Sequence, residues 1–317
     1  MPDRKTKLDG VAIASLLLCC ALWGLNQTVT KITLADVPPL LQAGSRSLGA
    51  ALLVALWAAS RGISLSLRNG TLAGGLLAGT LFAAEFAAIF IGLQYTQASR
   101  MIVFIYLSPF VVALGMPLVV RSERPTARQL AGLAVAFAGV AWAFAEGLTG
   151  AASGGRPVGD AGASPATSTV LGDALGLLAA LLWGATTLAI RGSKLASASA
   201  EQTLFYQLAV SGVLLTAGSL AVGEPWPALA SLGARPLGLM AFQTVVVTFA
   251  SYLLWFWLMR HYPATAITSF TLLTPLFGLL AGVWLLNEPL TLRLGVACAA
   301  VVLGIALVNR APRLAPE

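Results

Sequence analysis

Charged side chains are scarce in this sequence. Only 10% of its 317 residues are Asp, Glu, Lys or Arg, whereas 58% are apolar. A soluble domain carries about 25% charged residues, so this chain has too few charges to cover a water-facing surface. The surplus of apolar residues indicates that much of the surface faces lipid.

Residues that support catalysis or metal binding are scarce as well. His261 is the only histidine, and the three cysteines (Cys19, Cys20 and Cys298) lie in apolar runs without metal-ligand spacing. No G-x-x-x-x-G-K-[ST] motif is present to hold the phosphates of ATP. We therefore expect no cofactor, no metal and no ATP-driven cycle. A membrane-embedded enzyme acting on lipid-linked substrates is the least favoured reading, because no nucleophile and base stand together.

Long uncharged runs follow one another along the chain. The runs 11–30, 101–120, 202–223, 236–259 and 262–287 contain no charged residue, and 129–145, 174–190 and 294–309 are shorter runs flanked by charges. Two more, 40–60 and 71–93, each contain one charge, Arg46 and Glu85. Runs of about 20 residues cross roughly 30 Å of hydrocarbon as a helix. We predict an all-α integral membrane protein with ten transmembrane helices.

The Lys and Arg residues are distributed unequally between the two sides of these spans. With the N-terminus in the cytoplasm, thirteen of them lie on the cytoplasmic side and five on the other, with Arg46 inside a span. This bias favours cytoplasmic N- and C-termini. The membrane that we expect is the inner (plasma) membrane of a bacterium. The net charge of +7 is then a signature of membrane orientation and not of a nucleic-acid partner.

One segment, 148–170, is rich in Gly, Ala, Ser and Pro and predicts an external flexible linker. It separates a first repeat (1–147) from a second (171–310), each with five spans, and a cytoplasmic tail (311–317) follows. An odd number of spans per repeat inverts the second repeat relative to the first. Inverted repeats are typical of transporters that alternate access to a site between the repeats.

Short motifs recur in the same order in both repeats. Leu22-Trp23-Gly24 corresponds to Leu182-Trp183-Gly184, Ala98-Ser99 to Ala264-Thr265, Ser108-Pro109 to Thr274-Pro275, and Glu123-x-x-Thr126 to Glu288-x-x-Thr291. With Arg46 in the second span, this pattern resembles the EamA-type module of the drug/metabolite transporter superfamily. The second repeat departs from the pattern, because Gln207 stands where an arginine is expected. The resemblance implies a ten-helix monomer that moves small metabolites, most similar to bacterial exporters of aromatic and other amino acids.

Arg46 and Glu85 are the two charges deep within spans, at matching depth on consecutive helices. A charge there costs at least roughly 2.5 kcal/mol on insertion scales, so each should face a cavity or a partner. They could pair with each other as a structural lock, or bind the carboxylate and ammonium of a zwitterion. Glu85 could instead exchange a proton, as in an antiporter of lipophilic cations.

Other polar and aromatic residues within the spans complete the candidate substrate site. The full set is Trp23, Asn26, Gln27, Arg46, Glu85, Tyr106, Trp183, Thr187, Tyr206, Thr248, Tyr252 and Trp255. Pro109 and Pro275 remove a backbone donor within helices and are candidate hinges. Glu123 and Glu288 precede spans and are predicted to complement the dipole of the helix that follows each. The resulting hypothesis is a secondary transporter exporting amino acids, with an antiporter of lipophilic cations as the alternative.

Overall fold

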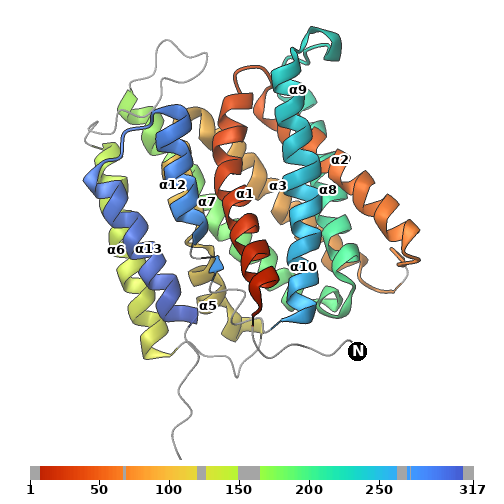
Figure 1. Ribbon diagram of the computed structural model, residues 1–317, viewed down its shortest axis with the longest axis horizontal. Coiled ribbons are helices and arrows are strands. Elements are labelled where there is room, and N and C mark those ends of the chain that lie inside the picture. The colour runs from red at the N-terminus through yellow and green to blue at the C-terminus, as the bar shows by residue number, and fades with distance from the viewer. Residues whose placement is uncertain are drawn as a thin grey trace, which may run out of the picture.

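A computed structural model describes residues 8–66, 69–119, 126–148, 165–262, 270–271 and 273–309, and throughout this part the chain forms helices and turns without a strand (Figure 1). The long elements are α1 (Gly10–Thr33), α2 (Pro39–Ser60), α3 (Leu72–Tyr95), α4 (Ala98–Ile105), α5 (Ser108–Val119), α6 (Ala127–Leu148), α7 (Pro165–Arg191), α8 (Ala200–Ala221), α9 (Ala234–Ala241), the π-helix η3 (Phe242–Ser251), α10 (Tyr252–His261), α12 (Leu273–Leu286) and α13 (Leu292–Asn309). Two 3-10 turns, η1 (Lys194–Ser197) and η2 (Leu229–Ser231), lie in the connections.

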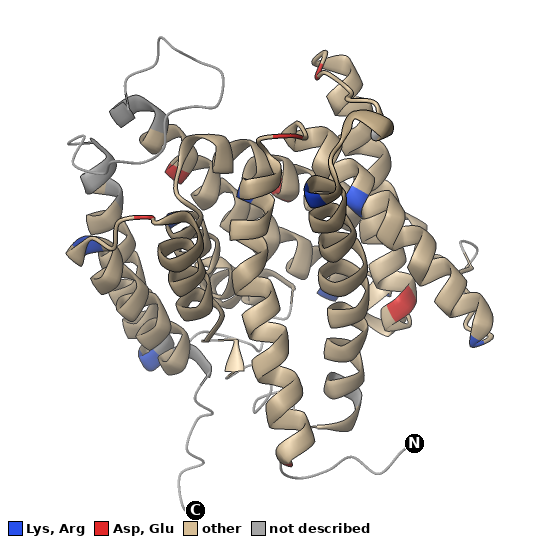
Figure 2. Cartoon of the chain, turned by 45° about the horizontal axis from the view of Figure 1, so that its top comes forward, with Lys and Arg blue, Asp and Glu red and all other residues tan. Residues whose placement is uncertain are grey.

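Seven of the described helical segments are long and apolar enough to cross a membrane, and three further apolar helices are shorter. The shorter ones are Leu130–Ala143, Leu273–Leu286 and Leu292–Leu307. Few residues along the helices are charged (Figure 2). Large apolar side chains are exposed on the outer surface, among them Leu118, Trp284 and Leu292. The predicted all-helical membrane protein agrees with these features.

The helices run between two ends of the bundle. At one end, which we call the lower end, α1 begins and α10 and α13 finish; at the upper end α1 finishes and α2 and α4 begin (Figure 1). Tyr262, after α10, donates a hydrogen bond to Asp9, before α1, at the lower end. Asp9 also caps α1 by accepting the amide N–H of Ala12. These contacts fix the relative height of α1 and α10.

The two halves of the chain pack against each other in a reciprocal pattern. The first helix of each half lies against the fourth of the other, so that α1 contacts α12 and α7 contacts α4 and α5. The second helices pair as α2 with α8, and the last pair as α6 with α13. Segments far apart in the sequence therefore form the shared interior of one bundle.

Three features differ from the sequence prediction. The fourth span is broken, because Tyr106 and Leu107 form a turn between α4 and α5. The eighth span contains the ten-residue π-helix η3 between α9 and α10. Helix α7 begins at Pro165, within the segment predicted as a linker, which suits proline because a helix's first turn needs no N–H from it. Residues 149–164 of that linker lie outside the described part.

Candidate functional site

A cavity of about 510 Å³ lies in the interior of the bundle. Eleven of the twelve residues predicted from the sequence line it: Trp23, Asn26, Gln27, Arg46, Glu85, Tyr106, Trp183, Thr187, Thr248, Tyr252 and Trp255. The twelfth, Tyr206, lies outside it. Tyr206 directly precedes the cavity-lining Gln207, but its ring packs against Gly75 of α3. The Tyr206 hydroxyl forms a hydrogen bond with the Thr71 hydroxyl.

Arg46 of α2 and Glu85 of α3 both line this cavity and are almost fully buried, at 2% and 4% exposure. No salt bridge joins them, and Arg46 Nε and Nη2 and Glu85 Oε2 have no hydrogen-bond partner among the described residues. The guanidinium carbon of Arg46 instead lies 4.2 Å from the centre of the Phe86 ring. The structural lock considered from the sequence is therefore absent, and both charged groups keep hydrogen-bonding capacity.

Two amides of α1 lie at the same cavity. Asn26 and Gln27 are each 7% exposed, and their side-chain oxygens have no hydrogen-bond partner within the described residues. An unsatisfied buried polar group costs about 1–3 kcal/mol, so several of them in one place need a compensating partner. With Arg46 and Glu85 they give the cavity donors, acceptors and both signs of charge.

Aromatic rings form two walls of the cavity. On one side Trp23 packs against Trp255 and Tyr252, with ring centres 5.1 and 5.9 Å apart, and its Nε1 donates to Ser251 Oγ over 2.8 Å. On the other side Trp183 packs edge-on against Tyr106 at 5.6 Å. Such rings offer a broad apolar surface with few polar atoms. The cavity can therefore accept an apolar or aromatic group beside its polar residues.

The repeated Trp-Gly pair explains how each first helix reaches the cavity. A Cβ on Gly24 would come within 2.6 Å of the backbone N of Gly278 in α12, and one on Gly184 within 2.5 Å of the side chain of Val111 in α5. Glycine thus allows close packing against the opposite half, as small residues do between membrane helices. The tryptophan before each glycine then lines the cavity.

Irregular backbone lies beside the cavity at two places. Thr248 in the π-helix donates its hydroxyl to the carbonyl of Gln243, over 2.8 Å, and π-helical segments are frequent at functional sites. Pro109 lines the cavity immediately after the α4–α5 break. Pro275 is buried in the first turn of α12 and does not line the cavity. Motion about either proline stays a prediction.

Several lining residues were not singled out from the sequence. Phe82, Phe86 and Ile89 of α3 surround Glu85, and Gln207 comes from α8. The signals that could have found them are the three- and four-residue spacing of the α3 side chains about Glu85 and the correspondence of Gln207 to Arg46. Apolar residues are abundant in every span, so their type alone does not distinguish the cavity from the lipid face.

Polar contacts hold the upper end of the bundle together. The Glu288 carboxylate accepts the backbone N–H groups of Ala98, over 2.7 Å, and Ser99, over 2.9 Å, at the start of α4. Lys31 of α1 lies 3.8 Å from Glu288 and donates to the carbonyl oxygen of Thr96. Glu288 therefore lies at the start of a helix, as predicted. The helix is α4, 190 residues away in the sequence, and not α13, which follows Glu288. Its counterpart Glu123 lies outside the described residues. We call this contact set the upper tie.

A buried ion pair lies beside the upper tie. Arg100 of α4 pairs with Asp173 of α7, and both side chains are at most 1% exposed. Arg100 also donates to the carbonyl oxygen of Ala143, and Asp173 accepts from Thr96. Removing one partner of such a pair strands a buried charge, at about 3–5 kcal/mol. The pair ties α4, α6 and α7 together above the cavity.

The lining of the cavity extends toward the lower end. It includes Phe256 of α10, Thr271 before α12 and Ile305 near the end of α13, whereas the upper-tie residues Lys31 and Glu288 are not part of it. The cavity is thus separated from the upper end by hydrogen-bonded and ion-paired contacts.

Comparisons with known proteins identify the family of the chain. The sequence profile of the EamA-like transporter family matches residues 10–145 and 170–310, and the chain belongs to this family. The uncharacterized transporter YvbV of Bacillus subtilis is 30% identical over 320 residues, covering 98% of this chain and 93% of that protein. A probable amino-acid metabolite efflux pump of Escherichia coli K12 is 25% identical, covering 90% of this chain and 89% of its own length. A crystal structure 20% identical in sequence covers 94% of this chain and 97% of its own with a TM-score of 0.62, a likeness of fold.

Proposed function

We propose that this protein is a secondary transporter that exports apolar and aromatic amino acids by alternating access. The observation that carries the proposal is the combination of unpaired Arg46 and Glu85 in one cavity with aromatic walls. An amino acid brings a carboxylate for the arginine, an ammonium for the glutamate and a side chain for the aromatic rings. Each buried charge then gains a partner, which offsets the cost of holding it within a membrane.

The amides and the aromatic walls would recognise different parts of the substrate. Asn26 and Gln27 can accept hydrogen bonds from the substrate's ammonium through their unpartnered side-chain oxygens. The aromatic walls discriminate among side chains only weakly, since one methylene in an apolar pocket changes binding by about 1–3 kcal/mol. We expect selectivity to be broad among apolar and aromatic amino acids. The name of the Escherichia coli relative, a probable amino-acid metabolite efflux pump, supports the same substrate class.

The transport cycle rests on the relation between the two halves. Their reciprocal packing supports ten crossings arranged as two inverted five-helix repeats, with the cavity at the interface. The Lys and Arg bias supports a cytoplasmic location for the lower end, in the inner membrane of a bacterial cell. The upper tie then closes the cavity from the outside, so that the protein loads substrate from the cytoplasm. Nothing in this cycle requires a second subunit, and we propose a monomer.

Counterflow in liposomes tests the proposal directly. Full-length protein reconstituted in vesicles preloaded with unlabelled phenylalanine should accumulate labelled phenylalanine, tryptophan or methionine without ATP. Protein-free vesicles are the control. If no amino acid moves while tetraphenylphosphonium exchanges for protons, the antiporter of lipophilic cations replaces this proposal. Glu85 would then be the shared site, although Arg46 in the same cavity disfavours a permanent cation.

The aromatic wall gives a second test. Trp183→Ala removes the ring that packs against Tyr106 and lines the cavity. Counterflow of tryptophan and phenylalanine should weaken more than counterflow of alanine, because only the aromatic substrates lose a ring contact of about 0.5–1.5 kcal/mol. Equal losses for large and small substrates would indicate that Trp183 supports the fold and does not contact substrate.

A further inference from the structure

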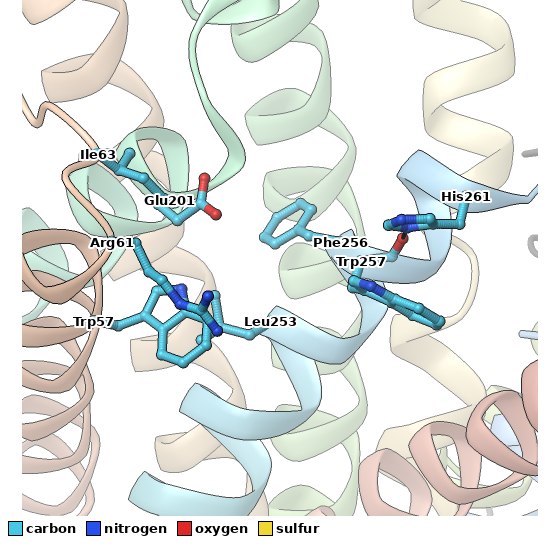
Figure 3. Close-up of a pocket in the computed structure, with 8 residues that line it drawn as sticks. All are labelled: Trp57, Arg61, Ile63, Glu201, Leu253, Phe256, Trp257 and His261. Carbon is cyan, nitrogen blue, oxygen red and sulfur yellow. Dashed lines mark hydrogen bonds between the residues drawn. The ribbon is translucent and has the colours of Figure 1, made fainter. Parts of the chain in front are cut away.

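A second cavity, of about 350 Å³, lies at the lower end of the bundle between the end of α2 and α10 (Figure 3). Its lining is Trp57, Arg61, Ile63, Glu201, Leu253, Phe256, Trp257 and His261. We call it the α2–α10 pocket. Its volume falls in the range of about 300–1,000 Å³ that is usual for small-molecule sites.

The lining of the α2–α10 pocket combines charge with aromatic surface. Arg61 places its guanidinium carbon 4.6 Å from the centre of the Trp57 ring, which restricts the arginine to one side of the pocket. On the opposite side Trp257 stacks on His261 at 4.5 Å, and His261 Nδ1 lies 2.8 Å from the carbonyl oxygen of Trp257. Glu201, 7% exposed, contributes a carboxylate from the start of α8. Figure 3 shows these side chains arranged around the ring of Phe256.

The α2–α10 pocket repeats the chemistry of the central cavity. Each has one arginine, one glutamate and several aromatic rings, so each offers partners to a carboxylate, an ammonium and an apolar side chain. Phe256 lines both cavities, which places them on the two sides of one side chain. A ligand released from one pocket therefore has a short route to the other past a single ring.

We propose that the α2–α10 pocket is a second binding site for zwitterionic aromatic and apolar amino acids, from which substrate passes Phe256 into the central cavity. This inference rests on the proposed export of amino acids, because it assigns the loading step of that cycle to the lower end. Arg61 binds the carboxylate and the Trp257 side of the pocket packs against the side chain. Arg61, directly after α2, is exposed, so the pocket is accessible from the lower end on this side.

The experiment measures ligand binding at the pocket apart from transport. Ile63→Cys places a thiol in the lining, and the native cysteines Cys19, Cys20 and Cys298 are all buried. A membrane-impermeant maleimide added to inside-out vesicles should modify this thiol, and phenylalanine should slow the modification. The protection should persist when Arg46→Gln disables the central cavity. A thermal unfolding temperature close to that of the protein without substitutions shows that the Ile63→Cys protein is folded.

Arg61→Gln, added to the Ile63→Cys protein, should raise the half-protecting concentration of phenylalanine about tenfold, as expected for a lost charge-assisted hydrogen bond. Arg293→Gln is the matched control, since Arg293 also lies over a tryptophan, Trp142, at 5.9 Å, but lines neither cavity. Absence of protection, or its loss in the Arg46→Gln background, would overturn the inference. A lipid headgroup is the other zwitterion that this pocket meets. The inference would also be overturned if the rate of thiol modification depended on the phosphatidylethanolamine content of the vesicles and not on phenylalanine. If the protein without substitutions shows no counterflow of amino acids, the proposed function itself is refuted.

Discussion

The Arg46 guanidinium lies against aromatic rings and forms no salt bridge with a carboxylate among the described residues. Its central carbon lies 4.2 Å from the ring centre of Phe86 and 5.0 Å from that of Phe90, both on α3. A flat, delocalised cation stacks on rings and still presents its N–H groups at the edge, which the compact ammonium of lysine cannot do. The geometry of the site therefore depends on arginine as well as on positive charge.

Arg46→Lys tests this dependence. We expect the lysine variant to weaken phenylalanine binding nearly as much as Arg46→Gln, by about ten- to a hundredfold, because both lose the oriented N–H pair. Displacement of labelled phenylalanine from purified protein measures the affinity. Arg293→Lys, at an arginine outside the cavity, provides the control and should leave affinity unchanged. Full affinity in the Arg46→Lys protein would reduce the role of position 46 to its charge.

Residue identity predicted much of this cavity, but only where composition made a residue unusual. Arg46 and Glu85 stand out because a charge within an apolar run needs a reason to be there. Tyr206 was assigned to the cavity because of its type, whereas the rotation of α8 presents its neighbour Gln207 there instead. A membrane helix is apolar on all sides, so its sequence carries little information on which side faces inward.

Close helix packing around the cavity depends on glycines whose backbone meets backbone. At Gly24 the atoms that an added Cβ would meet include Gly278 N at 2.6 Å and Thr274 O at 2.9 Å, which cannot rotate away. At Gly218 the nearest atom is the flexible Leu40 Cδ1 at 3.6 Å, an ordinary contact. The two positions thus separate the packing role of glycine from its effect on helix propensity.

Alanine should destabilise the protein at Gly24 but not at Gly218. Gly24→Ala pushes α1 away from α12 and should lower the free energy of unfolding by about 1–3 kcal/mol. The melting temperature in detergent should fall accordingly. Gly218→Ala should be neutral or stabilising by up to about 1 kcal/mol, because alanine favours the helix. Thermal unfolding followed by tryptophan fluorescence compares them. Equal melting temperatures would mean that α1 and α12 separate without cost.

The presence of apolar helices was more predictable than their bounds and their internal irregularities. The uncharged runs fall on the described apolar helices, but α7 begins at Pro165, well before the predicted run 174–190, and α12 begins at Leu273, well inside the predicted run 262–287. The π-helix at Phe242–Ser251 contains neither proline nor glycine, so no local signal announces it. Glu288 precedes α13 in sequence, yet Asn287 turns the chain with a positive φ of 52° and directs the carboxylate to α4. Such contacts arise from tertiary packing, which a local pattern does not contain.

The orientation of the molecule in the membrane can be tested with two matched serines. Ser197 and Ser231 are exposed, each ends a 3-10 turn, and each donates its hydroxyl to the carbonyl three residues earlier. Ser197 follows α7 at the lower end and Ser231 precedes α9 at the upper end. In intact cells an impermeant maleimide should modify Ser231→Cys and not Ser197→Cys, because the proposed orientation has the lower end inside the cell. The reverse result would invert the proposed direction of loading.

Two glutamates join the halves at the upper end by the same chemistry but in different surroundings. Glu288 accepts two amides of α4, and Glu224 accepts those of Leu40 and Leu41 at the start of α2, over 3.0 and 2.8 Å. Helix α2 also packs along α8, with Gly44 against Thr216 and Gly212 against Leu48. We expect α2 and α8 to move together, so that the Glu224 contacts persist through the cycle while the upper tie breaks.

Glu288→Gln should therefore open the cavity to the outside, and Glu224→Gln should not. The amide keeps one acceptor but loses the charge that faces Lys31 and the start of α4. Losing about 1.4 kcal/mol of this contact shifts a two-state equilibrium roughly tenfold. Ile102→Cys, at a cavity-lining residue of α4, reports the change as faster modification by an impermeant reagent added outside. If Glu288→Gln and Glu224→Gln accelerate the modification equally, weakening either glutamate contact opens the upper end. Glu288 would then not be a specific gating residue.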